Sequence, residues 1–93
     1  MLESAIQKKV VSYLKECGAK VITLKVASVS GNADLVICYN GFYVEFEMKQ
    51  PGKHATKLQL IKGKETTEAG GHWFEIHSLD EAKEAIKLLG LPL

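Results

Sequence analysis

Two acids and a lysine stand on either side of a short turn in the middle of the chain. Asp34 begins one apolar run, and a second apolar run carries Glu47 and Lys49. The dipeptide Asn40-Gly41 lies between these runs and is the strongest short-range signal for a β-hairpin. A turn centred on it places Asp34 directly opposite Glu47, and we therefore expect the two carboxylates to be cross-strand neighbours.

The opposition of two like charges suggests the chemistry. Directly opposed Cβ atoms lie about 4.5–5.5 Å apart, where like charges destabilise a sheet unless something neutralises them. Because strand side chains alternate, Glu47 and Lys49 share one face and an amine lies beside the acids. Oxygen ligands suit Mg²⁺ or Mn²⁺, which polarise phosphate and lower the pKa of a bound water. An ordinary Glu/Lys ladder on an exposed hairpin face is the alternative, and it leaves the opposed acids unexplained.

The other residues predict the elements that hold this hairpin. Apolar side chains at three- and four-residue spacing predict a first helix, and β-branched alternation predicts strands. Gly63 should weaken the second helix, and Ser78-Leu-Asp-Glu81 is a capping box that opens the last one. The expected order is αβββαβα, with helices over residues 3–17, 56–69 and 78–89 and strands over 20–26, 34–39, 42–49 and 72–77.

Length and composition restrict the class of protein. A chain of 93 residues and 10.2 kDa forms one domain, residues 1–93, and its 46% hydrophobic and 25% charged residues exclude a disordered chain. No apolar run approaches the ~20 residues that cross a bilayer, and the acidic start at Glu3 is unlike a signal peptide. We expect a soluble cytoplasmic protein. Cys17 and Cys38 lack zinc-ligand spacing and are interpreted as buried thiols.

Charge is segregated along the chain. Residues 49–64 contain five lysines and no acid, whereas residues 65–84 hold six of the eleven acids. All twelve basic residues are lysine, so phosphate attraction is available but the arginine fork that reads guanine is missing. Any nucleic acid bound here should be recognised by its backbone and shape.

Four blocks of residues together resemble a known family. Asp34 followed by Glu47-Met48-Lys49 looks like the D…ExK core of the PD-(D/E)XK nuclease superfamily, and the αβββαβα order is similar to its core fold. More narrowly, the chain resembles the VRR-NUC domain in its short stand-alone phage form, over nearly its whole length. The blocks are Glu3 with Gln7, Gly31-x-Ala33-Asp34-Leu35, Glu47-Met-Lys-Gln-Pro-Gly52, and Thr56-x-x-Gln59.

The resemblance implies a restriction-endonuclease-like α/β fold, in which helices flank a central mixed four-stranded sheet. It implies that Asp34 and Glu47 bind Mg²⁺ or Mn²⁺ with help from the Met48 main-chain carbonyl, and that Lys49 is the catalytic lysine. Ala33 stands where the family usually has proline, but this position shapes the strand entry and ligates nothing. Two further residues are expected to contribute to catalysis, namely Glu3 in the first helix and Gln59 in the second.

The implied activity is metal-dependent hydrolysis of DNA phosphodiesters, in branched DNA such as four-way junctions or at flaps and ends. A non-catalytic DNA-binding module on the same fold, or a small α/β interaction protein, are the alternatives. Gln7 shares a helical face with Glu3 and should reach the same pocket. The expected DNA-binding residues are Gln7, Lys53, His54, Lys57 and Lys62.

Two expectations concern residues outside this set. His72 and His77 flank a strand without metal-ligand spacing and are assigned no role, and Glu45 faces Val36 as an accessory or exposed residue. A homodimer is expected because residues 88–93 are unusually apolar and because resolving a junction needs two symmetric cuts. The alternative is that these leucines cap the monomer's own core. If the chain is phage-encoded, it should act in the host cytoplasm.

Overall fold

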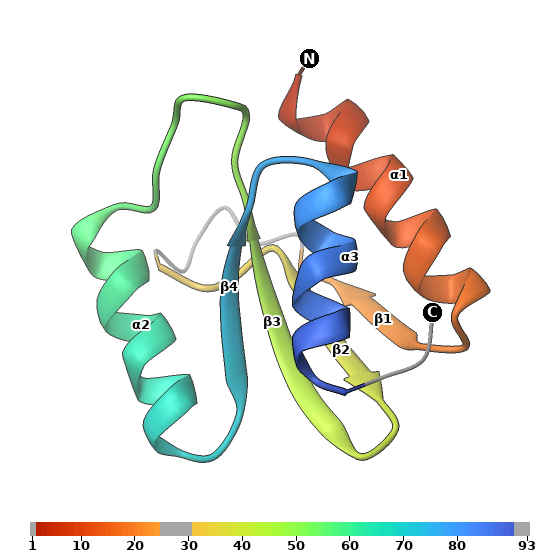
Figure 1. Ribbon diagram of the computed structural model, residues 1–93. Helices are drawn as coiled ribbons and strands as arrows, with labels where there is room; N and C mark the ends of the chain where they lie inside the picture. The colour runs from red at the N-terminus through yellow and green to blue at the C-terminus, as the bar shows by residue number, and fades with distance from the viewer. Residues whose placement is uncertain (1, 25–30, 91–93) are drawn as a thin grey trace.

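The computed structural model describes residues 2–24 and 31–90 of the chain. Helices and strands follow one another in the predicted αβββαβα order (Figure 1). The first strand ends at Thr23, and residues 25 and 26, where it was expected to continue, lie outside the described residues. The elements are α1 (Glu3–Glu16), β1 (Lys20–Thr23), β2 (Leu35–Tyr39), β3 (Phe42–Met48), α2 (Lys57–Glu68), β4 (His72–Ile76) and α3 (Leu79–Leu88).

The strands form one mixed sheet in the order β1-β2-β3-β4. The pairs β1·β2 and β2·β3 are antiparallel, and β3·β4 is parallel. Asn40 and Gly41 have φ values of 51° and 86°, the left-handed backbone that a two-residue hairpin turn requires. Leu35 pairs with Phe46, so the next residues outward, Asp34 and Glu47, lie opposite each other as predicted.

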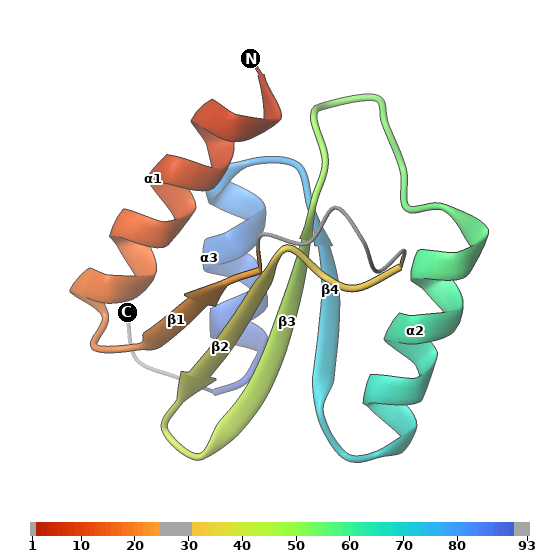
Figure 2. The same ribbon diagram turned by 180° about the vertical axis from the view of Figure 1, so that it is seen from behind.

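The two faces of the sheet are covered differently. Figure 1 shows α1 and α3 lying over one face, and Figure 2 shows the strands of the opposite face from behind, with α2 beside β4. The core lies between the first face and the two helices that cover it. Its fully buried side chains include Leu14 of α1, Leu35 and Ile37 of β2, Val44, Phe46 and Met48 of β3, and Ile86 of α3.

Alternation along β3 separates core from site. Phe46 and Met48 point into the core with no exposed surface, so Glu45 and Glu47 must point to the face beside α2. The same alternation puts Cys38 on that sparsely covered face. Cys38 is exposed and Cys17 is half-buried, so the expectation of two buried thiols is wrong.

The start of α3 also differs in part from the prediction. The Ser78 hydroxyl accepts from the Glu81 N–H at 3.1 Å, as in the expected capping box. The Glu81 carboxylate, however, accepts from the N–H of His77 at 2.8 Å instead of completing the box with Ser78.

None of the helices within the described residues has the length and apolar content needed to cross a bilayer.

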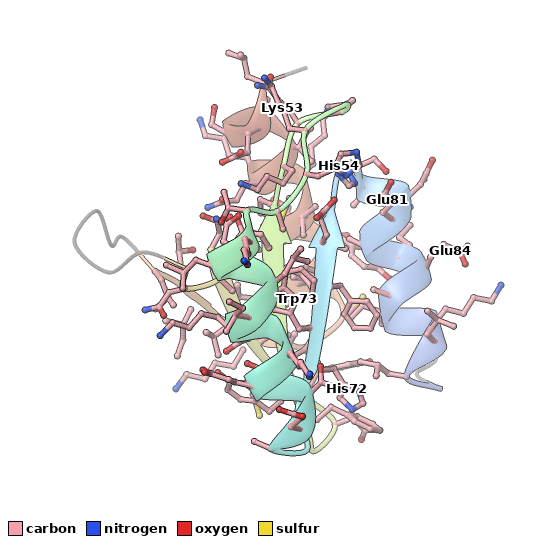
Figure 3. The ribbon with its side chains drawn as sticks, turned by 90° about the vertical axis from the view of Figure 1, so that its left-hand side faces the viewer. Lys53, His54, His72, Trp73, Glu81 and Glu84 are labelled. Carbon is pink, nitrogen blue, oxygen red and sulfur yellow. The ribbon has the colours of Figure 1, made fainter. Side chains whose placement is uncertain are left out.

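Contact between Gly63 and Trp73 holds α2 against β4. A Cβ built on Gly63 would lie 2.5 Å from the Trp73 Cδ2 atom, so only a glycine allows the helix to approach the indole ring this closely. Figure 3 shows Trp73 on β4 next to α2, on the side of the sheet away from α3. Gly63, expected to weaken the helix, is therefore what permits its packing.

This contact predicts the effect of Gly63→Ala. In an ordinary helix interior this change stabilises by about 1 kcal/mol, but here the added methyl should lower the free energy of unfolding by about 1–3 kcal/mol. Urea denaturation measures the effect. In a Trp73→Leu background the same substitution should become neutral or stabilising, whereas stabilisation in the wild-type background would contradict the packing argument.

Candidate functional site

Among the residues that the structure describes, Glu47 is the one charged side chain that is buried, with 2% of its surface exposed. One carboxylate oxygen, Oε2, accepts a hydrogen bond from Gln59 Nε2 at 3.2 Å and lies 3.7 Å from Lys49 Nζ. The other oxygen, Oε1, is buried and has no hydrogen-bond partner among the described residues. A buried carboxylate oxygen without a partner is costly, so this atom marks a position where a cationic ligand would be favourable.

Asp34 lies beside this carboxylate. Its side chain reaches across to β3, where Oδ2 accepts from the Met48 N–H at 2.8 Å. Its main-chain oxygen accepts from the Leu24 N–H at 2.9 Å, which ties the entry to β2 to the end of β1. Asp34 is thus held at both its backbone and its side chain next to Glu47.

The environment of Glu47 disfavours its negative charge. Burial raises its pKa to about 8, and the Asp34 carboxylate adds to this rise, while Lys49 opposes it. Glu3 on α1 also raises the pKa through its charge. Closely placed oxygen donors, an unpartnered buried oxygen and an excess of negative charge together fit a hard divalent cation such as Mg²⁺ or Mn²⁺.

Gln59 is oriented by the way its helix begins. Thr56 caps α2, its hydroxyl accepting from the Gln59 N–H at 3.2 Å, while Gln59 Oε1 accepts from the Thr56 N–H at 2.8 Å. Because the amide oxygen is committed to that N–H donor, the NH₂ group must point the other way, towards Glu47. A local capping box therefore fixes a side chain of the site.

The first helix contributes from the side. Glu3 and Gln7 line one shallow groove of about 600 Å³ together with Ser4 and Thr23, a groove that Asp34 and Glu47 do not line. Neither residue is hydrogen-bonded to Asp34 or Glu47, and Glu3 acts on Glu47 only through its charge. The structure thus brings together Asp34, Glu47, Lys49 and Gln59. Glu3 acts on Glu47 through its charge, and Gln7 lines the groove beside Glu3.

Apart from Gln7 on α1, the expected DNA-binding residues are spread along the loop and helix that follow β3. Lys57 begins α2 and is exposed, and Lys62 is half-buried in a cavity of about 320 Å³ that Glu45 also lines. Figure 3 shows Lys53 and His54 at the end of the molecule opposite His72. Glu45 itself faces Val36 as expected, and it accepts from the hydroxyls of Tyr43 and Thr66 at 2.6 and 2.7 Å.

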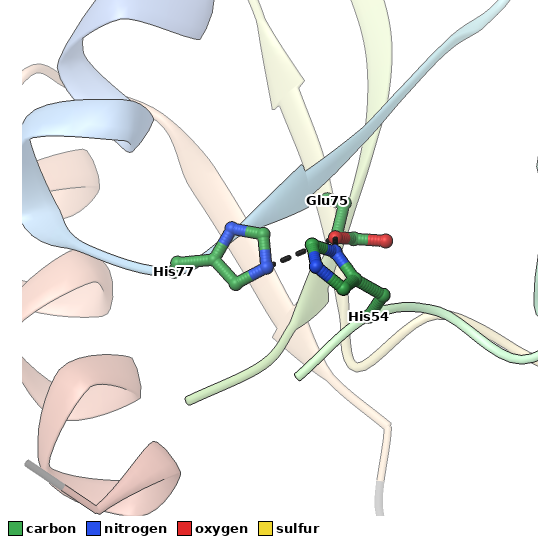
Figure 4. A group of neighbouring side chains, drawn as sticks. All are labelled: His54, Glu75 and His77. Atoms are coloured by element: carbon green, nitrogen blue, oxygen red, sulfur yellow. Dashed lines mark hydrogen bonds and ion pairs between the residues drawn. The ribbon is translucent and has the colours of Figure 1, made fainter. Parts of the chain in front are cut away.

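A second cluster was missed by the sequence reasoning. His54, Glu75 and His77 come together at the C-terminal end of β4, with ligand atoms within 4.8 Å of one another (Figure 4). Such a group of two imidazoles and a carboxylate can hold a divalent metal. Linear spacing gave no sign that His77 would meet His54 and Glu75. The detectable signal was Glu75-x-His77, which puts both side chains on one face of the strand.

A mixed four-stranded sheet in the order β1-β2-β3-β4, flanked by three helices, is consistent with a restriction-endonuclease-like fold. One solved structure described as "VRR_NUC domain" superposes with a TM-score of 0.78 and 22% sequence identity, over 91% of this chain and 94% of that chain. This likeness confirms the expected VRR-NUC fold. No family model matches the sequence, and no curated protein matches it significantly.

The raised pKa of Glu47 predicts how the metal-free domain responds to pH. Between about pH 4.5 and 8 the folded state retains a proton that the unfolded chain has lost, so the free energy of unfolding should fall as pH rises. Glu47→Gln removes this contribution. With chelator present, urea denaturation at pH 5 and pH 8 should show the variant gaining stability relative to wild type at the higher pH.

The matched control for this measurement is Glu45→Gln, which removes a charge from the same strand but from a carboxylate that has two hydroxyl partners. If the difference in free energy of unfolding between Glu47→Gln and wild type stays constant from pH 5 to pH 8, the conclusion that this site disfavours a charged Glu47 is wrong.

Proposed function

We propose that this protein is a Mg²⁺- or Mn²⁺-dependent DNA endonuclease that hydrolyses phosphodiester bonds in structured or branched DNA. The observation that carries the proposal is the buried Glu47 carboxylate beside Asp34, which has one oxygen without a partner and the other 3.7 Å from the Lys49 ammonium. A solvent-exposed Glu/Lys ladder would not bury the acid. The VRR-NUC fold adds support, since its name denotes a nuclease domain.

Asp34, Glu47 and the Met48 main-chain carbonyl are the proposed metal ligands. When bound, the cation would polarise a phosphate oxygen and lower the pKa of a water molecule. The Lys49 ammonium is largely enclosed, with 17% of its side chain exposed, and its charge would position the attacking water or offset charge on the phosphorane. Gln59 orients the Glu47 carboxylate through Nε2, and Glu3 adds negative charge from α1.

Binding of DNA is proposed to involve the lysine-rich segment that leaves the site. The residues proposed to contact DNA come from three segments: Gln7 from α1, Lys53 and His54 from the loop after β3, and Lys57 and Lys62 from α2. Ammonium groups attract phosphate without reading bases, and the chain has no arginine, so the protein should select DNA by shape. Four-way junctions are the favoured substrate in this proposal, with flaps and duplex ends as alternatives. The protein would act in the cytoplasm, which would be that of the host cell if the protein is phage-encoded.

Site variants test the catalytic assignment. Asp34→Asn and Glu47→Gln should abolish cleavage of a labelled junction while preserving or tightening DNA binding, because each removes a negative charge near phosphate. Lys49→Ala should lower the cleavage rate at least about 100-fold, which is the usual effect of removing a catalytic group. Glu45→Gln, on the same face but engaged by Tyr43 and Thr66, should remain active.

Cleavage should also require Mg²⁺ or Mn²⁺ and stop in excess chelator. If wild-type protein binds junction DNA in both metals without cutting junction, flap, duplex or single-stranded DNA, the alternative of a non-catalytic DNA-binding module on this fold replaces the nuclease proposal.

We further propose that the active form is a homodimer. Leu88 near the C-terminus is 76% exposed, and a twofold dimer would present two equal sites for the two cuts that a junction needs. Light scattering at micromolar concentration should give twice the chain mass, and Leu88→Glu should shift it towards the monomer. A monomeric mass with unpaired nicks on a junction would remove the dimer and leave the nuclease proposal intact.

A further inference from the structure

The cluster formed by His54, Glu75 and His77 is built around one carboxylate. Glu75 Oε2 lies 2.9 Å from His54 Nδ1 and 2.9 Å from His77 Nε2, so both imidazoles approach the same oxygen from different segments (Figure 4). Glu75 Oε1 accepts from the Ala55 N–H at 2.7 Å, which fixes the orientation of the carboxylate. Three donor atoms thus converge on one point at the C-terminal end of β4.

His77 is held from both sides. Its Nδ1 lies 2.8 Å from Glu81 Oε1, and its Nε2 lies 2.7 Å from the Lys53 main-chain oxygen as well as close to Glu75. Glu81, Lys53 and Glu75 all present acceptor oxygens to the ring, so in the metal-free protein Nδ1 and Nε2 both donate. A bound metal would replace the Nε2 proton, while the Nδ1–H would go on donating to Glu81 as an outer-shell partner.

We propose that His54 Nδ1, Glu75 Oε2 and His77 Nε2 bind a Zn²⁺ ion, separately from the Mg²⁺ or Mn²⁺ proposed at Asp34 and Glu47. Two imidazoles with one carboxylate match zinc, whose bonds to nitrogen and oxygen are about 2.0–2.2 Å, whereas Mg²⁺ prefers oxygen alone. His54 has 77% of its side chain exposed, so a fourth position would face solvent and could hold water.

The position of this site suggests its effect. Glu75 is the β4 partner of Glu47 in the parallel ladder, so the zinc site would lie one strand away on the same face. Residues 49–56 connect Lys49 at the end of β3 to the Thr56 cap of α2, and His54 lies within this segment. A bound Zn²⁺ would fasten the segment to β4 and stabilise the alignment of Lys49 with Gln59.

Zinc binding can be measured without any nuclease assay. The protein for the test carries Cys17→Ser and Cys38→Ser, so that its thiols cannot hold the metal. Equilibrium dialysis against micromolar Zn²⁺ with millimolar Mg²⁺ should give one zinc per chain, and Co²⁺ substitution should give a visible absorption band. Thermal denaturation should show a higher Tm with Zn²⁺ than with Mg²⁺ alone.

Variants locate the ion. His54→Ala, a change at an exposed loop residue, should remove the stoichiometric zinc, and His77→Ala should do the same. Glu81→Gln should weaken binding by about 10–100-fold, the usual effect of losing an outer-shell partner. His72→Ala is the matched control, because His72 lies at the opposite end of β4 and should leave binding unchanged (Figure 3).

Two results would overturn the proposal: no zinc bound by the thiol-free protein at micromolar concentration, or undiminished zinc in the folded His54→Ala variant. Asp34→Asn should retain its zinc. Loss of cleavage in Asp34→Asn with zinc retained therefore separates this site from the nuclease site, and zinc binding by a protein without nuclease activity would leave the zinc site standing alone.

Discussion

The register of the β2–β3 hairpin is the constraint on which the site depends. With Leu35 opposite Phe46, every inward position of β3 is apolar and every outward position near its end is acidic or basic. A slip of one residue would turn Glu47 into the core and Phe46 out of it. The burial of Phe46 and Met48 therefore secures the position of Glu47, so core packing and site geometry have the same cause.

The fold then holds a destabilising feature in place. Glu47 is buried beside Asp34, with one oxygen unpartnered and with a pKa of about 8. Contacts from three directions support this arrangement: the Met48 N–H holds Asp34, Lys49 lies beside the carboxylate, and Gln59 donates to it. An electrostatically unfavourable group of this kind is typical of functional sites, where a bound ligand compensates for it.

The unequal covering of the sheet explains where chemistry is found. α1 and α3 cover one face and bury the core side chains against it, whereas α2 approaches the other face closely where Gly63 meets Trp73. That second face can therefore carry polar groups, and both the Glu47 site and the Glu75 cluster lie on it, on adjacent strands. The loop that joins the end of β3 to the start of α2 contributes His54 to the Glu75 cluster.

Local signals in the sequence determined much of this protein. Asn40-Gly41 set the hairpin and hence the Asp34–Glu47 opposition, alternation set which side chains are buried, and Thr56 with Gln59 marked the start of α2. Each of these features depends on residues that are close in the chain or joined by a two-residue turn, so each can be predicted from the sequence. Residue spacing also predicted the element order.

Only the tertiary structure decided the contacts between distant segments. The parallel pairing of β4 with β3 sets Glu75 beside Glu47, and the path of the loop brings His54 to His77, which no linear spacing encodes. Whether a glycine at position 63 stabilises the protein depends on its contact with Trp73 of β4. Cys38 is exposed because it lies on the face of the sheet that α2 covers only in part. These outcomes follow from long-range packing, which is set by the whole core and not by any one segment.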